Sequence, residues 1–308
     1  MQDKIYDLLI LGAGPAGITA GVYAIRKKID FLVLTENIGG QTTWSGDIEN
    51  YTGFQFITGP QLTLKFQEHM DSYGINVKMP QTVKEITQDD DIFTVKTHDN
   101  SYQSRTVLIS TGKTPRLLNI PGEQEFKNRG VTYCATCDGP IFKDKPVAVI
   151  GGGNSALDAV LQMMKISPHV HLINNTRGLN ADNIMTEKAR AAANVTVYNN
   201  AQVKEIHGDT FVKNIRLSQN DKEFDIPVEG VFIEIGLIPN SRIAHNVEKN
   251  EHEEIIVDAH NQTNIKGLFA AGDVTDVPEK QIIIAAGEGA KATLSIFRYL
   301  NVHTFTYS

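Results

Sequence analysis

The sequence IYDLLILGAGPAG at residues 5–17 decides the fold. Its short, nearly continuous apolar run is typical of a buried strand, and it leads directly into glycines and then a helical stretch over 18–27. In such a turn Gly12 makes the tight bend, Gly14 lets the backbone approach a pyrophosphate, and Gly17 lets the helix pack on the strand. With the next apolar run at 31–34, the pattern predicts a Rossmann unit that binds a dinucleotide.

The same pattern returns in the middle of the chain, where PVAVI at 146–150 leads into GGGNSA at 151–156. A helical stretch over 157–165 and a strand-like run over 170–173 follow. A glycine-rich turn that only joins a strand to a helix is the alternative for this second copy. We favour a second nucleotide site, either functional or relic.

The rest of the chain indicates two domains rather than one. The apolar run GLFAAGD at 267–273, with a helical stretch over 283–300 behind it, is interpreted as the closing piece of the first unit. Further strand-like segments are 83–86, 93–97, 106–109, 195–198 and 231–235. We predict an α/β fold with two Rossmann-like, three-layer ββα domains, the second inserted into the first. The predicted bounds are 1–113 with 244–308 for the first domain and 114–243 for the second.

Composition excludes several other classes of protein. The chain has 308 residues, 41% of them hydrophobic and 21% charged, which are ordinary values for a folded globular protein. Its net charge of −7 supplies no positive field for nucleic acid or anionic lipid. No apolar run approaches the roughly 20 residues that span a bilayer, and the start breaks into Gly and Pro too early for a signal peptide. We therefore expect a cytoplasmic protein without a nucleic-acid or membrane partner.

The two cysteines stand three positions apart, as Cys134 and Cys137, directly before Asp138. In a cytosolic protein this spacing indicates redox chemistry rather than a disulfide scaffold. Two buried core thiols are the alternative. One pair of cysteines cannot form a four-ligand zinc site, and the histidines show no metalloprotease spacing, so no metal site is predicted.

These motifs together resemble the low-molecular-weight thioredoxin reductase family of flavoproteins, and the resemblance covers essentially the whole chain. The motifs are GAGPAG at 12–17, GGQ at 39–41, ENY at 49–51, STG at 110–112, CATCDGP at 134–140, GGGNSA at 151–156, AAGDV at 270–274 and KQI at 280–282. CDGP followed by GGGNS and KQIIIAAGEGAKA is also similar to the reductase portion of the alkyl hydroperoxide reductase flavoprotein subunit, which normally carries extra N-terminal redox domains.

The resemblance implies that non-covalent FAD binds to the first domain. The residues that would hold it are Gly12, Gly14, Pro15, Ala16 and Gly17 at the pyrophosphate, Gly40, Gln41 and Asn50 beside it, Val83 at the adenine, Thr111 and Gly112 from the STG motif, and Gly272, Asp273, Lys280, Gln281 and Ile282 at the ribityl chain and the isoalloxazine edge. A carboxylate such as Asp273 can accept a hydrogen bond from a ribityl hydroxyl, or it could cap the next turn. Either Thr35 or Glu36 could reach the adenosine ribose.

The family's assignment also implies the roles of the cysteines. Cys137 would face the flavin, Cys134 would attack the disulfide of a thioredoxin-like protein, and Asp138 would act as the acid. A nearby helix N-terminus would lower the pKa of a thiol, and Asp138 could in addition serve as an N-cap. The family is usually homodimeric, and a rotation of one domain against the other would present the cysteines alternately to flavin and partner.

The electron donor is where the chain departs from the family. NADPH-dependent members show His-Arg-Arg-x-x-x-Arg after the second unit's second strand, whereas this chain reads NNTRGLN at 174–180. The loss of two contacts to the 2′-phosphate would weaken the binding of NADPH about a hundredfold or more, so NADPH is disfavoured as the donor. NADH would find no acidic residue at Asn174, although an Asn can bond to a ribose and Arg177 could approach. We favour a one-electron carrier, as in ferredoxin-dependent flavin thioredoxin reductases, over NADH.

The sequence thus predicts an FAD-dependent disulfide oxidoreductase that serves a thioredoxin-like protein. The alternatives are a reductase for a peroxidase system and a flavin-binding redox sensor without turnover. A related ferredoxin:NADP oxidoreductase is disfavoured, because those relatives lack the cysteine pair. The acidic runs at 89–91 and 251–254 are interpreted as solvated loops, Trp44 as core or as a partner or flavin contact, and the aromatic tail 302–308 as a fraying end.

Overall fold

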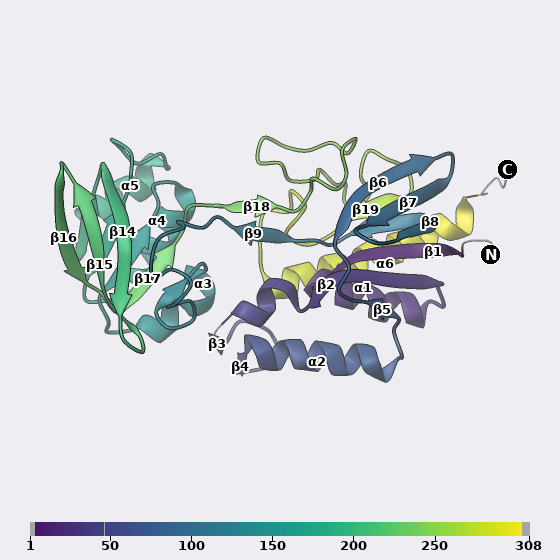
Figure 1. Cartoon of the computed structure of the whole chain (residues 1–308), viewed down its shortest axis with the longest axis horizontal. Helices are drawn as coiled ribbons and strands as arrows, with labels where there is room; N and C mark the ends of the chain where they lie inside the picture. The colour runs from purple at the N-terminus through teal and green to yellow at the C-terminus, as the bar shows by residue number, and fades with distance from the viewer. Residues whose placement is uncertain (1–3, 46, 304–308) are drawn as a thin grey trace. The chain divides into compact units, whose positions relative to one another are not determined.

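The computed structural model describes residues 4–45 and 47–303 of the chain, which divides into two compact units (Figure 1). The chain passes between the units at Trp44–Ser45, Asn50–Tyr51, Thr114–Pro115 and Leu237–Ile238. The segments at the last two of these places pair with each other as strands β9 (Lys113–Pro115) and β18 (Leu237–Pro239). The first unit comprises Met1–Trp44, Tyr51–Thr114 and Ile238–Ser308, and the second comprises Ser45–Asn50 and Pro115–Leu237. The side chain of Trp44 and residues 304–308 lie outside the described part, so the expectations for them stay predictions.

The first unit contains a seven-stranded sheet in the order β5-β2-β1-β8-β7-β6, with β19 beside β8. Neighbours among β5, β2, β1, β8 and β19 run parallel, while β6, β7 and β8 form an antiparallel meander. The strands are β1 (Ile5–Ala13), β2 (Phe31–Ile38), β4 (Ile57–Thr58), β5 (Val77–Lys78), β6 (Val83–Asp89), β7 (Ile92–Thr97), β8 (Ser101–Ile109) and β19 (Leu268–Ala270). The helices are α1 (Pro15–Arg26), α2 (Gly59–Ser72), α6 (Ile282–Val302) and the 3₁₀ helix η1 (Gly40–Trp44).

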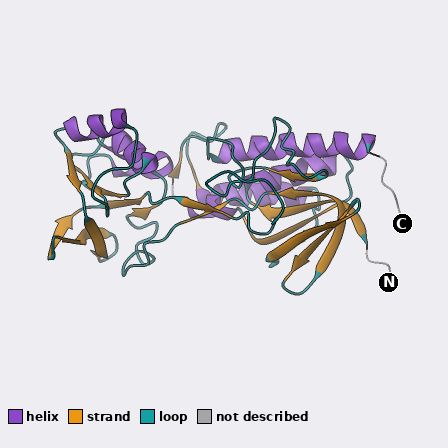
Figure 2. Cartoon of the chain, turned by 90° about the horizontal axis from the view of Figure 1, so that it is seen from above, coloured by secondary structure: helices purple, strands orange, loops and turns teal. Residues whose placement is uncertain are grey.

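The middle of strand β1, residues 8–11, is apolar throughout because both of its faces are covered. Leu8 and Ile10 pack in the core beneath the helices, and Figure 2 shows helices gathered on one side of this sheet. Leu9 and Leu11 pack in a second core on the opposite face. Helix α1 begins at Pro15, three residues before the predicted start, because proline is well suited to the first position of a helix.

The second unit contains a five-stranded parallel sheet in the order β10-β17-β11-β12-β13 and a separate antiparallel sheet, β14-β15-β16. Its strands are β3 (Asp47–Ile48), β10 (Val131–Thr132), β11 (Val147–Ile150), β12 (Val170–Ile173), β13 (Val195–Tyr198), β14 (Ala201–Gly208), β15 (Val212–Gln219), β16 (Lys222–Pro227) and β17 (Gly230–Ile233). Its helices are α3 (Ala135–Asp138), η2 (Gly139–Phe142), α4 (Asn154–Met163) and α5 (Asn183–Ala191). The predicted α/β fold with two Rossmann-like units is confirmed, although the β14 to β16 sheet was not located in advance.

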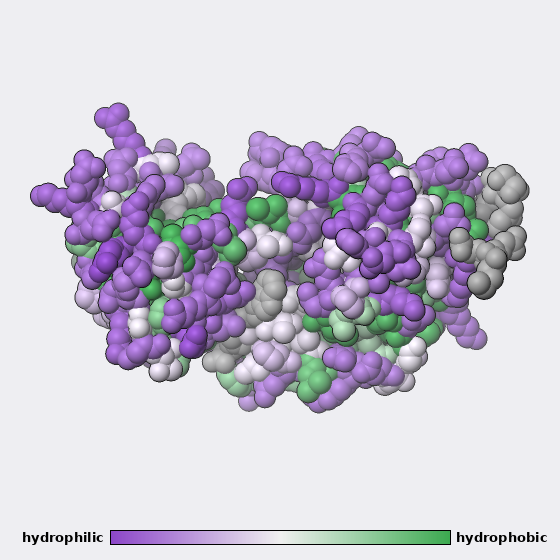
Figure 3. Space-filling model, viewed as in Figure 1, coloured by the Kyte–Doolittle hydropathy of each residue, from purple (hydrophilic) through white to green (hydrophobic). Residues whose placement is uncertain are grey.

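The surface seen in Figure 3 is mainly polar, with apolar residues in small patches. None of the described helices combines the length and the apolar character that crossing a membrane requires. Even α6, with 21 residues, carries Glu288, Lys291 and Arg298 along its length.

Helices α1 and α6 approach each other at backbone contact, which generates a stability prediction. A Cβ at Gly289 of α6 would lie 2.0 Å from the carbonyl oxygen of Ala16, whereas a Cβ at Gly287 would meet nothing within 4 Å. We expect Gly289→Ala to destabilise the protein by roughly 1–3 kcal/mol, since backbone must move to admit the methyl group. Gly287→Ala should be neutral or stabilise by up to about 1 kcal/mol, because alanine favours the helix. Urea unfolding of both variants checks this, and equal midpoints would contradict it.

Candidate active site

Three of the segments predicted to hold FAD follow neighbouring parallel strands at one edge of the sheet of the first unit. Strands β1, β8 and β19 are parallel, with Leu11 beside Ile109 and Ile109 beside Ala270. Their carboxyl ends therefore lie side by side, and this edge is where nucleotides bind in open α/β sheets. The segments that follow the three strands are 12–17, 110–112 and 272–273.

The first glycine turn leaves room for a phosphate. Gly12 has a φ of +103°, and a Cβ there would lie 2.5 Å from the carbonyl oxygen of Ser110. A Cβ at Gly17 would lie 1.8 Å from the carbonyl oxygen of Gly12, so neither position admits a side chain. A Cβ at Gly14 would meet nothing within 4 Å, and Gly40 lies on the same side. This open space at the N-terminus of α1 fits a pyrophosphate.

Thr35 and Glu36, the two candidates for binding the adenosine ribose, lie near the end of β2 and differ in exposure. The hydroxyl of Thr35 is buried; it accepts a hydrogen bond from the backbone of Ala13 at 3.1 Å and donates one to the carbonyl oxygen of Asn37 at 2.7 Å. Glu36 is exposed. We therefore favour Glu36 for the ribose and Thr35 as a residue that braces the turn.

The remaining predicted contacts lie in several elements. Gln41 is partly buried in η1, and Val83 is partly buried at the start of β6. Gln281 is the N-cap of α6, and Ile282 is the first residue of that helix. Asn50 is exposed and belongs by its contacts to the second unit.

Asp273 fits its predicted role toward a hydroxyl group. It is partly buried after β19, and burial raises the pKa of its carboxyl while Lys280 and Lys113 oppose that shift. Among the described residues it has these two charged neighbours but no hydrogen-bond partner. A ribityl hydroxyl would supply that partner.

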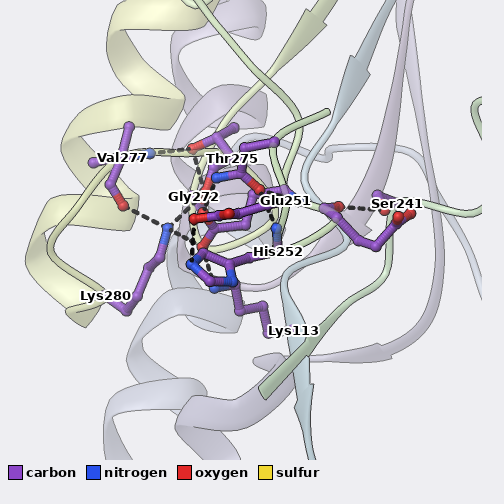
Figure 4. Close-up of polar contacts among 11 residues, drawn as sticks. Lys113, Ser241, Glu251, His252, Gly272, Thr275, Val277 and Lys280 are labelled. Atoms are coloured by element: carbon purple, nitrogen blue, oxygen red, sulfur yellow. Dashed lines mark hydrogen bonds and ion pairs between the residues drawn. The ribbon is translucent and has the colours of Figure 1, made fainter. Parts of the chain in front are cut away.

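The two lysines near Asp273 are held by Glu254, and Figure 4 shows both of them, Lys113 and Lys280. One carboxylate oxygen of Glu254 pairs with Lys113 Nζ and, at 3.2 Å, with Lys280 Nζ. Burial by itself would raise the pKa of Glu254, but hydrogen bonds from Lys113 and Asn250 and the charges of both lysines lower it to about 2. The side chain of Glu254 is only 11% exposed, so the interpretation of 251–254 as a solvated loop is wrong at its last residue.

Lys280 differs from its predicted role as a direct cofactor contact. Its ammonium group donates to the carbonyl oxygens of Thr275, at 2.6 Å, and of Val277, and it pairs with Glu254. These three partners use its three N–H bonds. Lys280 can therefore act on a cofactor through its charge and by positioning the chain.

In the second unit Cys134 and Cys137 form a disulfide, with 5.3 Å between their Cα atoms. Cys134 is the N-cap of α3, and the N–H of Cys137 donates to its Sγ at 3.2 Å. Both residues are partly buried. The alternative of two separate core thiols is therefore excluded.

Asp138 is buried beside the disulfide and is linked to it by Thr132. The hydroxyl of Thr132 donates to a carboxylate oxygen of Asp138 and accepts from the N–H of Cys134 at 3.3 Å. The side chain of Asp138 makes no capping hydrogen bond to η2, so a capping role is not supported. Asp138 also lines a cavity of about 290 Å³ together with Val131 and Phe142, which leads from the buried acid toward the surface.

Glu234 is a site residue that the sequence did not indicate. It directly follows β17, and its carboxylate accepts a hydrogen bond from the N–H of Ala135 at 3.2 Å. Burial raises the pKa of Glu234 to about 7; the bond from Ala135 opposes this shift and the charge of Asp158 adds to it. The available signal was a lone acid in the apolar run VFIEIG at 231–236.

The second glycine turn is partly covered by the loop that follows β12. Asn174 is 2% exposed, and its Oδ1 lies 2.4 Å from where a Cβ of Gly152 would stand. Its amide nitrogen donates within this loop and to Asn199, and its Oδ1 accepts from Thr176. The expectation that Asn174 could bond to a ribose is therefore not met in this geometry. Arg177 is exposed on the same loop.

Comparison with known proteins places these sites in context. A family model described as pyridine nucleotide-disulphide oxidoreductase matches residues 6–289. NADH dehydrogenase of Bacillus subtilis (strain 168) is 43% identical over 299 residues, which are 96% of this chain and 58% of that protein. The F subunit of alkyl hydroperoxide reductase in Escherichia coli (strain K12) is 41% identical over 304 residues, with the same two shares. The chain thus spans 58% of the length of these relatives.

The chain is also similar to solved structures of thioredoxin reductases. Thioredoxin reductase from Streptococcus pyogenes MGAS5005 is 35% identical, with a TM-score of 0.92 over 98% of this chain and 100% of that one. A ferredoxin-flavin thioredoxin reductase from Clostridium acetobutylicum is 28% identical, with a TM-score of 0.54 over 97% and 99%. These similarities confirm the resemblances that the motifs indicated. The matching family binds FAD and a pyridine nucleotide, in agreement with the FAD prediction.

The raised pKa of Glu234 generates a pH prediction. Below pH 4.5, its ordinary pKa, Glu234 is protonated in both the folded and the unfolded chain, so it does not lower the free energy of unfolding. Between pH 4.5 and about 7 only the unfolded chain ionises, and the free energy of unfolding falls as the pH rises. Above about 7 both states are ionised and the loss of stability is constant. We therefore expect Glu234→Gln to be more stable than the wild type at pH 8, by up to about 3 kcal/mol, and nearly equal to it at pH 4. Denaturant unfolding at both pH values measures this. The exposed Glu187→Gln serves as control, and a Glu234→Gln effect that is the same at both pH values would refute the assignment.

Proposed function

Because the chain belongs to the pyridine nucleotide-disulphide oxidoreductase family, we propose that it is an FAD-dependent reductase that delivers electrons to the disulfide of a thioredoxin-like protein. The observation that carries this proposal is the disulfide between Cys134 and Cys137, joined through Thr132 to the buried Asp138. A structural disulfide does not need a buried acid beside it, whereas thiol exchange does use one. The open turn at Gly14 supports FAD in the first unit, and so does Asp273, which has no hydrogen-bond partner among the described residues.

The proposed chemistry is a two-electron transfer followed by disulfide exchange. Bound FAD, once the electron donor has reduced it, would supply two electrons to the disulfide, which with two protons becomes two thiols. Cys134, as a thiolate, then attacks the partner's disulfide, forming a mixed disulfide and releasing one partner thiolate that takes a proton from Asp138. Cys137 next attacks Cys134, which restores the internal disulfide and frees the second partner thiol. Asp138 regains its proton from water through the cavity that it lines.

We propose that the electron donor is not NADPH and favour a one-electron carrier protein of ferredoxin type. The three arginine positions of the NADPH-binding pattern are occupied by Asn175, Thr176 and Asn180, so the side chains that would bind a 2′-phosphate are missing from their places. The Asn174 amide is buried and used within its own loop, so it offers no hydrogen bond to a ribose. A ferredoxin at about −400 mV that feeds a thioredoxin at about −270 mV would release roughly 6 kcal/mol for two electrons.

NADH is the second candidate, and two observations favour it. The turn GGGNSA at 151–156 keeps its glycines and stands at the start of α4, as in a working nucleotide site. The two relatives at 41–43% identity are named as an NADH dehydrogenase and as a component of alkyl hydroperoxide reductase. The second name makes a peroxidase component the alternative electron acceptor.

The cysteine pair generates a prediction on turnover. In the double variant Cys134→Ser/Cys137→Ser we expect steady reduction of a thioredoxin disulfide to fall at least about a thousandfold, because no internal thiol remains for exchange. Flavin reduction by the donor should persist in the same variant. The assay follows free thiols on the acceptor protein, with thioredoxin and a peroxidase component tested separately. Absence of turnover by the wild type with every acceptor would favour a redox sensor.

The donor assignment generates a second prediction. When the FAD-loaded protein is mixed anaerobically with reduced ferredoxin, NADH or NADPH, we expect the flavin absorbance band to bleach fastest with ferredoxin and slowest with NADPH. Asn174→Asp supplies a carboxylate in place of the amide and should not slow the reaction with ferredoxin. Rapid bleaching of the wild type by NADPH would refute the assignment, and rapid bleaching by NADH alone would establish the second candidate.

A further inference from the structure

Glu254 is a buried carboxylate that takes no part in the proposed disulfide chemistry. It lies in the segment between β18 and β19, and its side chain is 11% exposed. A buried charge is costly unless it is paired, and here it is paired twice, with Lys113 and Lys280. The side chains of the two lysines are 8% and 18% exposed. The cluster is therefore largely shielded from water.

The two lysines come from the two segments that are predicted to hold the flavin. Lys113 directly follows Gly112, and Lys280 directly precedes Gln281. Figure 4 shows both lysine side chains reaching toward the same point from different elements. Asp273 belongs to the same group, since both lysines act on its pKa. Glu254 thus joins two cofactor segments that are far apart in the sequence.

The carboxylate of Glu254 is also held by hydrogen bonds within its own loop. Asn250 donates to the second oxygen of Glu254 at 2.6 Å, and the side-chain oxygen of Asn250 accepts from the backbone N–H of Glu254 at 3.0 Å. On the opposite side, Lys280 is anchored by the carbonyl oxygens of Thr275 and Val277. The geometry of the ion pairs is therefore set by backbone contacts at both ends.

We propose that Glu254 is a positioning residue that fixes two ammonium groups beside the flavin and thereby sets the flavin's midpoint potential. Lys113, Lys280 and Glu254 together carry one positive charge in excess, and an ionised Asp273 brings the sum of the four groups to zero. Screening by water is weak in this place, so adding or removing one charge changes the electrostatic potential there. A positive charge near the cofactor favours the addition of electrons to it. The inference rests on the proposed function, because it requires FAD at Gly112, Asp273 and Gln281.

The test varies the charge of the cluster in both directions. The parent is the FAD-loaded Cys134→Ser/Cys137→Ser protein, in which the cysteines accept no electrons. Relative to this parent, Glu254→Gln adds one positive charge, Lys113→Met removes one, and the double variant leaves the sum unchanged. We expect Glu254→Gln to raise and Lys113→Met to lower the equilibrium constant for flavin reduction at least about tenfold, or about 30 mV for two electrons, and the double variant to match the parent.

The midpoint potentials are measured by anaerobic titration against an indicator dye, with flavin absorbance as the signal. Glu251→Gln is the matched control, because this side chain is 86% exposed and its one ion pair among the described residues is with His252, at 3.7 Å. We expect it to keep the parent's potential. FAD affinity and the unfolding temperature are recorded for each variant, since a merely structural role would lower both without the order of potentials that charge predicts.

Two results would overturn the inference. Equal potentials in the parent, Glu254→Gln and Lys113→Met, with FAD bound in all three, would show that the cluster does not act on the flavin. If Glu254→Gln does not fold, Lys113→Met decides by itself, and a potential equal to that of the parent overturns the inference. Failure of the parent to bind FAD is a different outcome, because it removes the proposed function as well.

Discussion

The parallel alignment of β1, β8 and β19 is the constraint on which the first unit depends. Because the three strands point the same way and stay in register, the segments that follow them emerge at one edge. The glycines at this edge determine how closely the backbone packs and where space is left for a ligand. Gly12 and Gly17 admit no Cβ, which keeps strand and helix at backbone contact, and Gly14 leaves an open space at the end of α1.

The second unit also has an α/β fold with a parallel sheet, but it carries the disulfide. Its disulfide turn is organised by backbone N–H groups that each have a defined acceptor. The N–H of Cys134 donates to Thr132, that of Ala135 to Glu234, and that of Cys137 to the sulfur of Cys134. Two carboxyl groups, those of Asp138 and Glu234, therefore lie close to the turn.

A glycine turn and a nucleotide site are separate properties, and the second unit shows why. The turn at 151–153 satisfies the steric needs of a strand-to-helix connection, which remain whether or not a nucleotide binds. Affinity for the nucleotide comes instead from side chains on the neighbouring loop. In this chain that loop holds Asn174 inward over Gly152. The scaffold of the turn is thus kept, while the Asn174 amide is bonded within its own loop.

The sequence by itself determined the two Rossmann units, the cysteine pair and the glycine positions, because these depend on local backbone geometry and on neighbours along the chain. Hydrophobic runs located β1, β11 and β12 well, and the Cys-x-x-Cys spacing indicated the disulfide. Helix starts were misplaced by a few residues at α1 and α4, where the turn glycines lead directly into the helix. The weakly apolar strands of the β14 to β16 sheet were not located.

Only the tertiary structure decided which charged groups are buried and what they meet. Glu254 reads as part of an acidic surface run, yet it is enclosed by lysines from segments far away in the sequence. Glu234 and Asn174 acquire their roles in the same way, from the N–H of Ala135 and from the loop around Gly152. The physical reason is that the ionisation of a side chain depends on its desolvation and on nearby charges. Both are properties of the folded neighbourhood rather than of the local sequence.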